Sequence, residues 1–464
     1  MLYSYSNGNL DAIKRIDNAA AEQIYSFTYD AFGNMTALKV GGKTLVSYTY
    51  GPGNGLLTNQ AYANGDSVTF TYDKIGRTKT ATYSDGRVLT YVYNGEGSLH
   101  SVTESNGSAV VTYLYSYDSV GRLISSEKYN DSTTTLRTHQ TYNADNQLKK
   151  QGWQMGDISY SEEYTYNSTD GTLDIMRTGV GDELSMAYDE LRRLSSVNGG
   201  NFNRTYTYRD ISDTQTTMQV ARLSYNLGSG LNYDYTYDNL GNIATYKKPD
   251  GEQITFTYDR QGQLLKAVGS STYTYSYDSV GNVLTANGHS YSYSNADWKD
   301  LLTAYDGESI TYDDSGNPTS YYNGTRWEMS WKNGRSLSRA VSSDTVIDFT
   351  YDLDGLRNTK TVDGIQHNYL YAGEKLLRES YGSDVLDFFY DANGTPYALK
   401  YNDSIYYYIA NLQGDVVQIV DTNGNTVANY EYDPYGKVIS SIGAIAEVNP
   451  IRYRGYYYDK ETEL

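Results

Sequence analysis

The stretch GRTKTATYSDGRVLTYVYNGEG, residues 76–97, contains the pattern that decides the fold. Two runs within it, TKTATY and RVLTYVY, have the Thr, Val and Tyr content that is typical of β-strands. Asp85-Gly86 between the runs is a hairpin-turn signal, and a second turn, Asn94 to Gly97, closes the unit. The stretch therefore predicts one antiparallel β-hairpin.

The closing turn recurs along the chain as the motif Tyr-Asp-x-x-Gly. Ten strict copies are present, and looser copies begin at Tyr50, Tyr93, Tyr142, Tyr166, Tyr188 and Trp331. From Tyr29 to Tyr188 successive copies are spaced by 21 to 25 residues, the length of two strands and two turns. The sequence predicts an all-β fold of antiparallel β-hairpin repeats of about 21 residues each. The motif residues are Tyr29, Asp30, Gly33, Tyr72, Asp73, Gly76, Tyr117, Asp118, Gly121, Tyr237, Asp238, Gly241, Tyr258, Asp259, Gly262, Tyr277, Asp278, Gly281, Tyr312, Asp313, Gly316, Tyr351, Asp352, Gly355, Tyr390, Asp391, Gly394, Tyr432, Asp433 and Gly436.

Each residue type of the motif has a physical role in a turn. The tyrosine ends a strand, and the aspartate that follows can accept a hydrogen bond from the backbone two residues later. The glycine supplies a positive φ angle, which is costly for other residues. At Asn146 the glycine is replaced by the other residue type that tolerates a left-handed backbone, which supports the turn interpretation.

Tyrosine supplies much of the packing surface, since the chain contains 54 of them among 464 residues. Tyrosines alternate with smaller or polar residues, as in Tyr233, Tyr235 and Tyr237. Because side chains alternate between the two faces of a strand, one face is expected to be aromatic. Cross-strand tyrosine ladders would then distribute stability along the array.

Composition argues against several function classes. The net charge of −19 opposes a nucleic-acid surface, which needs clustered Lys and Arg. The absence of cysteine excludes disulfides and thiolate sites. No apolar stretch is as long as a membrane-spanning helix. The first residues lack the apolar run of a signal peptide, so the sequence itself assigns no localisation.

No catalytic, cofactor-binding or metal-binding residue is expected. The four histidines have no metal-ligand spacing, and no nucleophile elbow is present. The stretches at Asp352 to Gly355 and at Asp421 to Asn425 are weakly similar to calcium loops but lack the glutamate at loop position 12. Both are interpreted as ordinary turns.

The C-terminal part carries the most specific family resemblance. YYYIANLQGDVVQIVDTNGNTVANYEYDPYGKV, residues 406–438, is followed by NPIRYRGYYYDKETEL, residues 449–464. With the repeat, these stretches resemble the Rhs or YD-repeat family, which includes bacterial Rhs proteins, wall-associated protein A, the C component of Tc toxins and the teneurin shell. The resemblance implies a β-sheet strip that spirals into a hollow shell, which in bacterial members encloses a C-terminal toxin. Its core-like residues are Arg452, Tyr453, Arg454, Gly455, Tyr458 and Asp459.

The resemblance also implies a division of the chain and several departures from the family. Residues 1–404 are expected to form the repeat array, and residues 405–464 the N-terminal part of the Rhs-associated core, continuous with the same shell. Glu463 stands where the family usually has glycine, and the sequence ends before the family's self-cleaving aspartyl protease segment and toxin. We therefore expect a non-enzymatic fragment, truncated at both ends.

Three function hypotheses follow. The first is a shell or scaffold of a polymorphic-toxin carrier, whose partners are a passenger toxin domain or the remaining shell segments, and which the resemblance places outside the cell or at its surface. The second is a carbohydrate-binding or adhesion module that uses exposed tyrosines on cell-surface glycans. The third is a choline-binding or glucan-binding β-solenoid. Repeats of that kind rely on tryptophan, and the presence of only 4 tryptophans disfavours this hypothesis. Open sheet edges are also expected to promote self-association.

Overall fold

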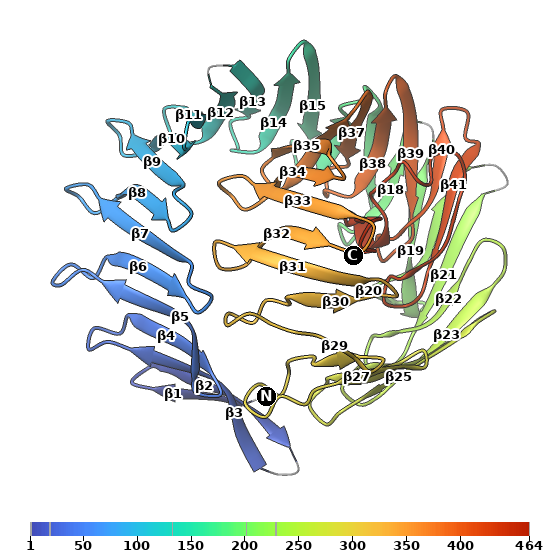
Figure 1. The fold of residues 1–464 in the computed structure, drawn as a ribbon. Helices are drawn as coiled ribbons and strands as arrows, with labels where there is room; N and C mark the ends of the chain where they lie inside the picture. Colours follow the sequence, from blue (N-terminus) through green and yellow to red (C-terminus); the bar gives the residue numbers. More distant parts are fainter. Residues whose placement is uncertain (1, 18–19, 132, 201, 228–229, 464) are drawn as a thin grey trace. The chain divides into compact units, whose positions relative to one another are not determined.

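The computed structural model describes residues 2–17, 20–131, 133–200, 202–227 and 230–463 (Figure 1). The described residues form 42 strands and one short 3-10 helix, Tyr453–Gly455. Paired strands run antiparallel and are mostly consecutive in sequence. The structure therefore confirms the all-β fold of antiparallel hairpins that the repeat predicts.

The chain divides into two compact units, each built from two stretches of sequence. Unit 1 comprises residues 1–137 and 275–367, and unit 2 comprises residues 138–274 and 368–464. The strands of unit 1 are β1 (Leu2–Ser6), β2 (Asn9–Asp17), β3 (Ala20–Tyr29), β4 (Met35–Val40), β5 (Lys43–Tyr50), β6 (Leu57–Tyr62), β7 (Ser67–Tyr72), β8 (Thr78–Tyr83), β9 (Val88–Tyr93), β10 (Leu99–Asn106), β11 (Ala109–Tyr117), β12 (Leu123–Asn130), β26 (Val283–Ala286), β27 (His289–Ser292), β28 (Ala304–Tyr305), β29 (Glu308–Ser309), β30 (Ser320–Tyr322), β31 (Arg326–Lys332), β32 (Ser336–Val341), β33 (Val346–Tyr351) and β34 (Arg357–Val362). We call β1–β12 the first strip of unit 1 and β26–β34 its second strip.

Unit 2 is built in the same way. Its strands are β14 (Leu148–Met155), β15 (Ile158–Tyr166), β16 (Leu173–Arg177), β17 (Glu183–Tyr188), β18 (Leu194–Asn198), β19 (Arg204–Ser212), β20 (Gln215–Tyr225), β21 (Leu231–Tyr237), β22 (Ile243–Lys247), β23 (Gln253–Tyr258), β24 (Leu264–Val268), β36 (Lys375–Tyr381), β37 (Asp384–Tyr390), β38 (Pro396–Tyr401), β39 (Ser404–Ala410), β40 (Val416–Asp421), β41 (Thr426–Tyr432) and β42 (Val438–Ile442). The first strip of unit 2 is β14–β24 and its second strip is β36–β42. The remaining strands, β13 (Thr133–Tyr142), β25 (Thr272–Tyr277) and β35 (Ile365–Ala372), contain residues of both units.

The strand register changes at the motif tyrosine. In the β7–β8 pair Thr71 lies opposite Thr80, whereas the next residue, Tyr72, lies opposite Thr78. Such a bulge bends the strand and increases its twist just before the turn. The same shift precedes the motif tyrosines at 29, 117, 237, 258, 277, 351, 390 and 432.

Within unit 1 the two strips contact each other through residues far apart in sequence. Arg15, which is buried, forms an ion pair with Asp300 of the second strip at 2.8 Å. The indole Nε1 of Trp298 donates to the hydroxyl of Tyr25, and the two rings meet edge to face. Unit 1 is therefore held together across the strips as well as along them.

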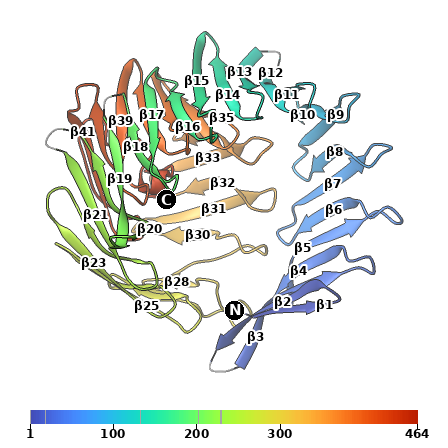
Figure 2. The same ribbon diagram turned by 180° about the vertical axis from the view of Figure 1, so that it is seen from behind.

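Unit 2 has equivalent contacts, and its strips lie side by side in both views (Figures 1 and 2). The hydroxyl of Tyr225 on β20 donates to the carbonyl oxygen of Ala410 on β39 at 2.7 Å. Arg204 on β19 forms a largely buried ion pair with Asp391, 2.8 Å away. These contacts fix one strip against the other inside the unit.

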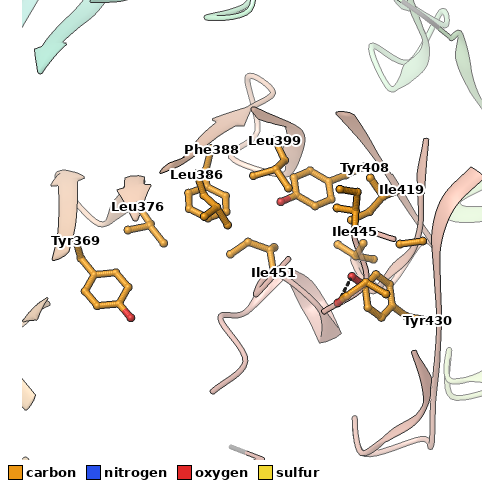
Figure 3. Close-up of a cluster of buried hydrophobic side chains, with 13 residues drawn as sticks. Tyr369, Leu376, Leu386, Phe388, Leu399, Tyr408, Ile419, Tyr430, Ile445 and Ile451 are labelled. Carbon is orange, nitrogen blue, oxygen red and sulfur yellow. Dashed lines mark hydrogen bonds between the residues drawn. The ribbon is translucent and has the colours of Figure 1, made fainter. Parts of the chain in front are cut away.

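A large apolar cluster lies in unit 2, beneath the segment that follows β42. Leu386, Phe388 and Leu399 from neighbouring strands are buried together. Ile445 and Ile451 from the segment pack onto this cluster (Figure 3). Because strands with one aromatic and one polar face cannot bury enough apolar surface alone, this covering segment supplies the missing layer.

Candidate functional site

Each strict motif forms a hydrogen-bonded turn, for which Asp73 is the example. The backbone N–H of Asp73 donates to the carbonyl oxygen of Arg77 at 2.9 Å, and that of Gly76 donates to the carbonyl oxygen of Asp73 at 3.2 Å. The carboxylate Oδ1 of Asp73 accepts the backbone N–H groups of Ile75 and Arg77, each at 3.0 Å. The carboxylate thus closes the turn from within.

The same two carboxylate bonds, to the N–H groups two and four residues later, occur in all ten strict motifs. Their aspartates are Asp30, Asp73, Asp118, Asp238, Asp259, Asp278, Asp313, Asp352, Asp391 and Asp433. Asn94, Asn143, Asp189, Asn411 and Asp421 make the same pair of bonds. An amide oxygen therefore replaces the carboxylate without changing the turn. Asn411 has no tyrosine before it, so a search for Tyr-Asp misses its turn.

The second carboxylate oxygen, Oδ2, accepts a bond from the side chain after the glycine. Asn34 Nδ2 lies 2.9 Å from Asp30 Oδ2, and Arg122 Nε lies 2.6 Å from Asp118 Oδ2. The side chain of Asn34 lowers the pKa of Asp30, and the backbone N–H of Arg122 lowers the pKa of Asp118. Both carboxylates therefore keep their charge to more acidic pH than an isolated aspartate.

The last turn position requires a left-handed backbone. Gly76 has φ 85°, and Asn146, which replaces the glycine in its own copy, has φ 68°. Arg192 occupies the corresponding position of the copy that begins at Tyr188, with φ 60°. This backbone conformation costs free energy for every residue that carries a Cβ, and the cost is smaller for asparagine than for most other residues. Arg192 is thus the strained variant of the turn.

The motif tyrosine connects its repeat to the preceding one. The hydroxyl of Tyr72 donates to the carbonyl oxygen of Leu57 at 2.6 Å, and that of Tyr390 to the carbonyl oxygen of Leu376 at 2.9 Å. These two acceptors lie at the start of a strand, whereas Val220, the acceptor of Tyr237, lies within β20, and Leu302, the acceptor of Tyr312, precedes β28. The same bond is made by Tyr29, Tyr50, Tyr93, Tyr166, Tyr188, Tyr208, Tyr237, Tyr258, Tyr312, Tyr351 and Tyr432.

The alternating tyrosines form ladders where rings from neighbouring strands meet. Tyr235 lies opposite Tyr246 in the β21–β22 pair, and their rings stack with centroids 5.3 Å apart. Tyr246 also stacks on Tyr233 at 6.1 Å, and all three rings are buried. Offset stacking of this kind stabilises a sheet beyond the area that it buries.

The core-like residues of the C-terminal segment lie together in unit 2, with Arg452 and Asp459 buried. The guanidinium of Arg452 donates to the carbonyl oxygens of Asn449 and Ala446 and lies 4.4 Å from the ring centroid of Tyr458. This arrangement gives a buried cation both hydrogen-bond acceptors and an aromatic face.

The next three residues anchor the segment to the strands. The hydroxyl of Tyr453 donates to the carbonyl oxygen of Pro434 at 3.1 Å, and the backbone N–H of Arg454 donates to Asp415 Oδ1 at 3.1 Å. Gly455, with φ 72°, then reverses the chain. Burial raises the pKa of Asp415.

Sequence reasoning missed Asn449, which is 1% exposed and lies at the centre of this segment. Its Oδ1 accepts the hydroxyl of Tyr408 at 2.8 Å, and its Nδ2 donates to the hydroxyl of Tyr430 at 3.2 Å and to the carbonyl oxygen of Ile451 at 2.6 Å. One amide thus satisfies two buried phenols from two strands. The only sequence signal is a polar residue between Val448 and Pro450.

A second buried group that the sequence did not reveal is Glu379. Its Oε1 accepts the hydroxyls of Tyr457 at 2.9 Å and of Tyr369 at 3.2 Å, and these two hydroxyls are 3.0 Å apart. Tyr457 belongs to the C-terminal segment, whereas Tyr369 and Glu379 belong to strands. The contact therefore fastens the segment to the sheet.

No group of three or more His, Asp or Glu side chains is arranged to hold a metal ion among the residues that the structure describes. The carboxylate of Asp352 accepts the N–H groups of Asp354 and Leu356, and that of Asp421 accepts those of Asn423 and Asn425. Both weakly calcium-like stretches thus form the common turn. Within the described ranges, no helix has the length and apolar character to cross a membrane.

Protein-family comparison identifies the repeat. A model described as Teneurin YD-shell matches residues 203–464, and one described as RHS Repeat matches residues 51–88. The chain is 29% identical over 354 residues to the tRNA3(Ser)-specific nuclease WapA of Bacillus spizizenii and to the tRNA nuclease WapA of Bacillus subtilis strain 168. The matched region is 70% of this chain, and the match covers only 14% of the length of each relative.

Solved structures show the same fold. A chain in the Photorhabdus luminescens Tc holotoxin pore structure matches 99% of this chain with a TM-score of 0.61 and 16% identity, over 28% of its own length. A chain in the crystal structure of TcdB2-TccC3-Cdc42 matches 98% of this chain with a TM-score of 0.62 and 16% identity, over 29% of its own length. At such identity the likeness concerns the fold alone.

Proposed function

Because this chain belongs to the teneurin YD-shell family, we propose that it is a non-enzymatic shell segment of an Rhs-type toxin carrier, which encloses or displays a C-terminal passenger. The main support for the proposal is that the polar groups of the motif form their hydrogen bonds within the repeat array itself. The turn carboxylates bond to turn N–H groups, and the tyrosine hydroxyls bond to the preceding repeat. Polar groups that bond in this way hold a wall together, which supports a structural role for the motif.

The buried network beneath the C-terminal segment supports the same function. Asn449 and Glu379 tie residues 443–463 to the strands of unit 2 through four tyrosine hydroxyls. A segment held so firmly fixes the point from which a following passenger would extend. In this proposal the carrier works outside the cell or at its surface.

A protection assay tests the carrier role. A protease-sensitive passenger is fused after residue 464, and its digestion is compared with that of the free passenger and of a fusion with a long flexible linker. Enclosure predicts slower digestion in the direct fusion only. Digestion of all three at one rate would contradict enclosure and leave display as the remaining form of the proposal.

The WapA relatives are named as tRNA nucleases, and we propose that this region of them does not contain the nuclease. With a net charge of −19, the chain is unsuited to gather a polyanion. Incubation of purified chain with tRNA is therefore expected to leave the tRNA intact. Cleavage that co-purifies with the chain and is lost on its denaturation would overturn this part of the proposal.

The alternative, a glycan-binding module, has support from two tyrosines of β1. Tyr3 and Tyr5 are exposed, so their rings could stack on sugars. The longer rows, such as Tyr233 and Tyr235, are buried and unavailable for this purpose. Binding on a glycan array that is lost in the Tyr5→Ala variant would favour this alternative.

A further inference from the structure

The hairpin repeat gives each strip two rows of turns. The Tyr-Asp-x-x-Gly turns follow one side of the strip, which we call the motif edge. The turns inside each repeat, such as Asp85-Gly86, follow the other side, which we call the hairpin edge. In unit 1 the two strips lie close enough for an edge of one strip to contact an edge of the other.

The motif edge of the second strip docks on the hairpin edge of the first. The backbone N–H of Asn64, in a hairpin turn, donates to Ser315 Oγ of a motif turn at 3.0 Å. The backbone N–H of Gly334, in the next motif turn, donates to Asp66 Oδ2 at 2.8 Å. Lys43 forms an ion pair with Asp314 at 2.6 Å. Motif edge and hairpin edge are therefore complementary surfaces.

Apolar residues at the tips of motif turns take part in this docking. Leu353, the residue after the aspartate of its motif, packs against the buried cluster of Val68, Ala81, Leu89 and Val102 in the first strip. Ser315, two residues after its aspartate, is only 1% exposed. On the docked motif edge Ser315 is thus buried and Leu353 half-buried, whereas Asp354 stays exposed.

The motif edge of the first strip has no such cover within unit 1. In Figure 1 the turn between β7 and β8 lies on the side of the first strip that faces away from β31–β34. Phe32, Ile75 and Val120 occupy the same motif position as Ser315 and are 86%, 74% and 73% exposed. These large apolar side chains stand on alternate motif turns, with Gly53 and Glu96 at the same position in the turns between them, and their high exposure along one edge points to an interaction surface.

The matching surface is present on the same chain. The hairpin edge of the second strip includes the exposed turns at Gly307 and at Asp363-Gly364, and Ile365 beside the latter is 57% exposed. Each molecule therefore carries one motif edge and one hairpin edge that unit 1 leaves uncovered.

We propose that the motif edge formed by Phe32, Ile75 and Val120 binds the hairpin edge of the second strip in another copy of this chain. The contact repeats between molecules the strip-to-strip contact that unit 1 makes within itself. It joins two different surfaces, so it is head to tail and each added copy leaves both kinds of edge open. It uses turns and side chains, and differs from the addition of strands at open sheet edges that the sequence predicted.

Sedimentation of edge-blocked variants tests the proposal. Ile75→Asp/Val120→Asp blocks the motif edge, and Ile365→Asp blocks the hairpin edge; all three positions are exposed, so the fold is expected to persist, as circular dichroism checks. Wild type is expected to grow in mass with concentration, and each blocked variant to remain a single chain. The conservative variant Ile75→Leu/Val120→Leu is the matched control and should associate like wild type.

Mixing provides the decisive measurement. Each blocked variant keeps the edge that the other lacks, so an equimolar mixture is expected to form dimers and nothing larger. Wild type that stays a single chain at every concentration would overturn the proposal. So would blocked variants that associate like wild type, or a mixture of the two variants that stays as single chains.

Discussion

Replacement of Tyr390 by phenylalanine isolates the bond that joins one repeat to the preceding one. The ring of Tyr390 packs against the apolar cluster that contains Leu386 and Phe388 in unit 2, and phenylalanine keeps that packing. The substitution removes the hydroxyl that donates to the carbonyl oxygen of Leu376, a residue with a buried side chain. Loss of one such bond, with its acceptor left in a largely buried site, is expected to lower the free energy of unfolding by about 1 to 2 kcal/mol.

Urea denaturation followed by tyrosine fluorescence and circular dichroism measures this change. Because repeat arrays can unfold in stages, hydrogen exchange should also show faster exchange confined to β36 and β37. Tyr456→Phe is the control, since Tyr456 is 69% exposed and its substitution is expected to change stability by less than about 0.5 kcal/mol. Equal stability of the Tyr390→Phe and Tyr456→Phe variants would refute the role assigned to the hydroxyl.

Further outcomes follow from the turns and from the C-terminal segment. Arg192→Gly should stabilise the chain by about 0.5 kcal/mol in urea denaturation because it relieves a left-handed arginine, while Asn146→Gly should have almost no effect. Asn449→Ala should destabilise unit 2 by about 1 to 3 kcal/mol and speed limited proteolysis within residues 443–463, since it removes the acceptor of the buried Tyr408 hydroxyl and the donor to Tyr430, whose hydroxyl keeps its bond to the carbonyl oxygen of Ala446. The pKa values of Asp30 and Asp118 lie below the ordinary 3.8 in the folded state, so their contribution is complete above that pH and is lost as the pH falls through the lowered values. Asp118→Asn, which keeps the turn geometry without titrating, should reduce the loss of stability in acid. If the free energy of unfolding of this variant fell with acid pH as steeply as that of the wild type, the assignment would be contradicted.

The turns are the part of the structure that the sequence predicts best, because their bonds are local. Asp73 needs only the two N–H groups that follow it within four residues, so its residue type and spacing determine the turn. Alternation of tyrosine likewise predicts which side chains share a face, as in Tyr233 and Tyr235.

The tyrosine hydroxyl bond was not predictable from residue types. Its acceptor is a backbone carbonyl, which every residue has, so Leu57 and Leu376 carry no signature of that role. The acceptor lies between 10 and 19 residues before the tyrosine, so the spacing becomes a signal only once the strands are known.

The contacts between the strips also could not be predicted from the sequence. Asn64 and Ser315 are separated by 251 positions, and each looks like an ordinary turn residue in its own repeat. Which turns meet depends on the twist that accumulates over many strands, and no local pattern records it. Asn449 was missed for a related reason, since its partners come from two distant strands.

The backbone acceptor of the motif tyrosine has a consequence for how such arrays change over generations. Leucine, methionine, threonine, isoleucine and valine all occur where the hydroxyl lands. A duplicated or deleted module would find a suitable oxygen on whichever neighbour it acquires, with no compensating mutation. The hydrogen bond therefore sets no requirement on the acceptor's side chain when the length of the array changes, although leucine supplies 8 of the 13 acceptors described above.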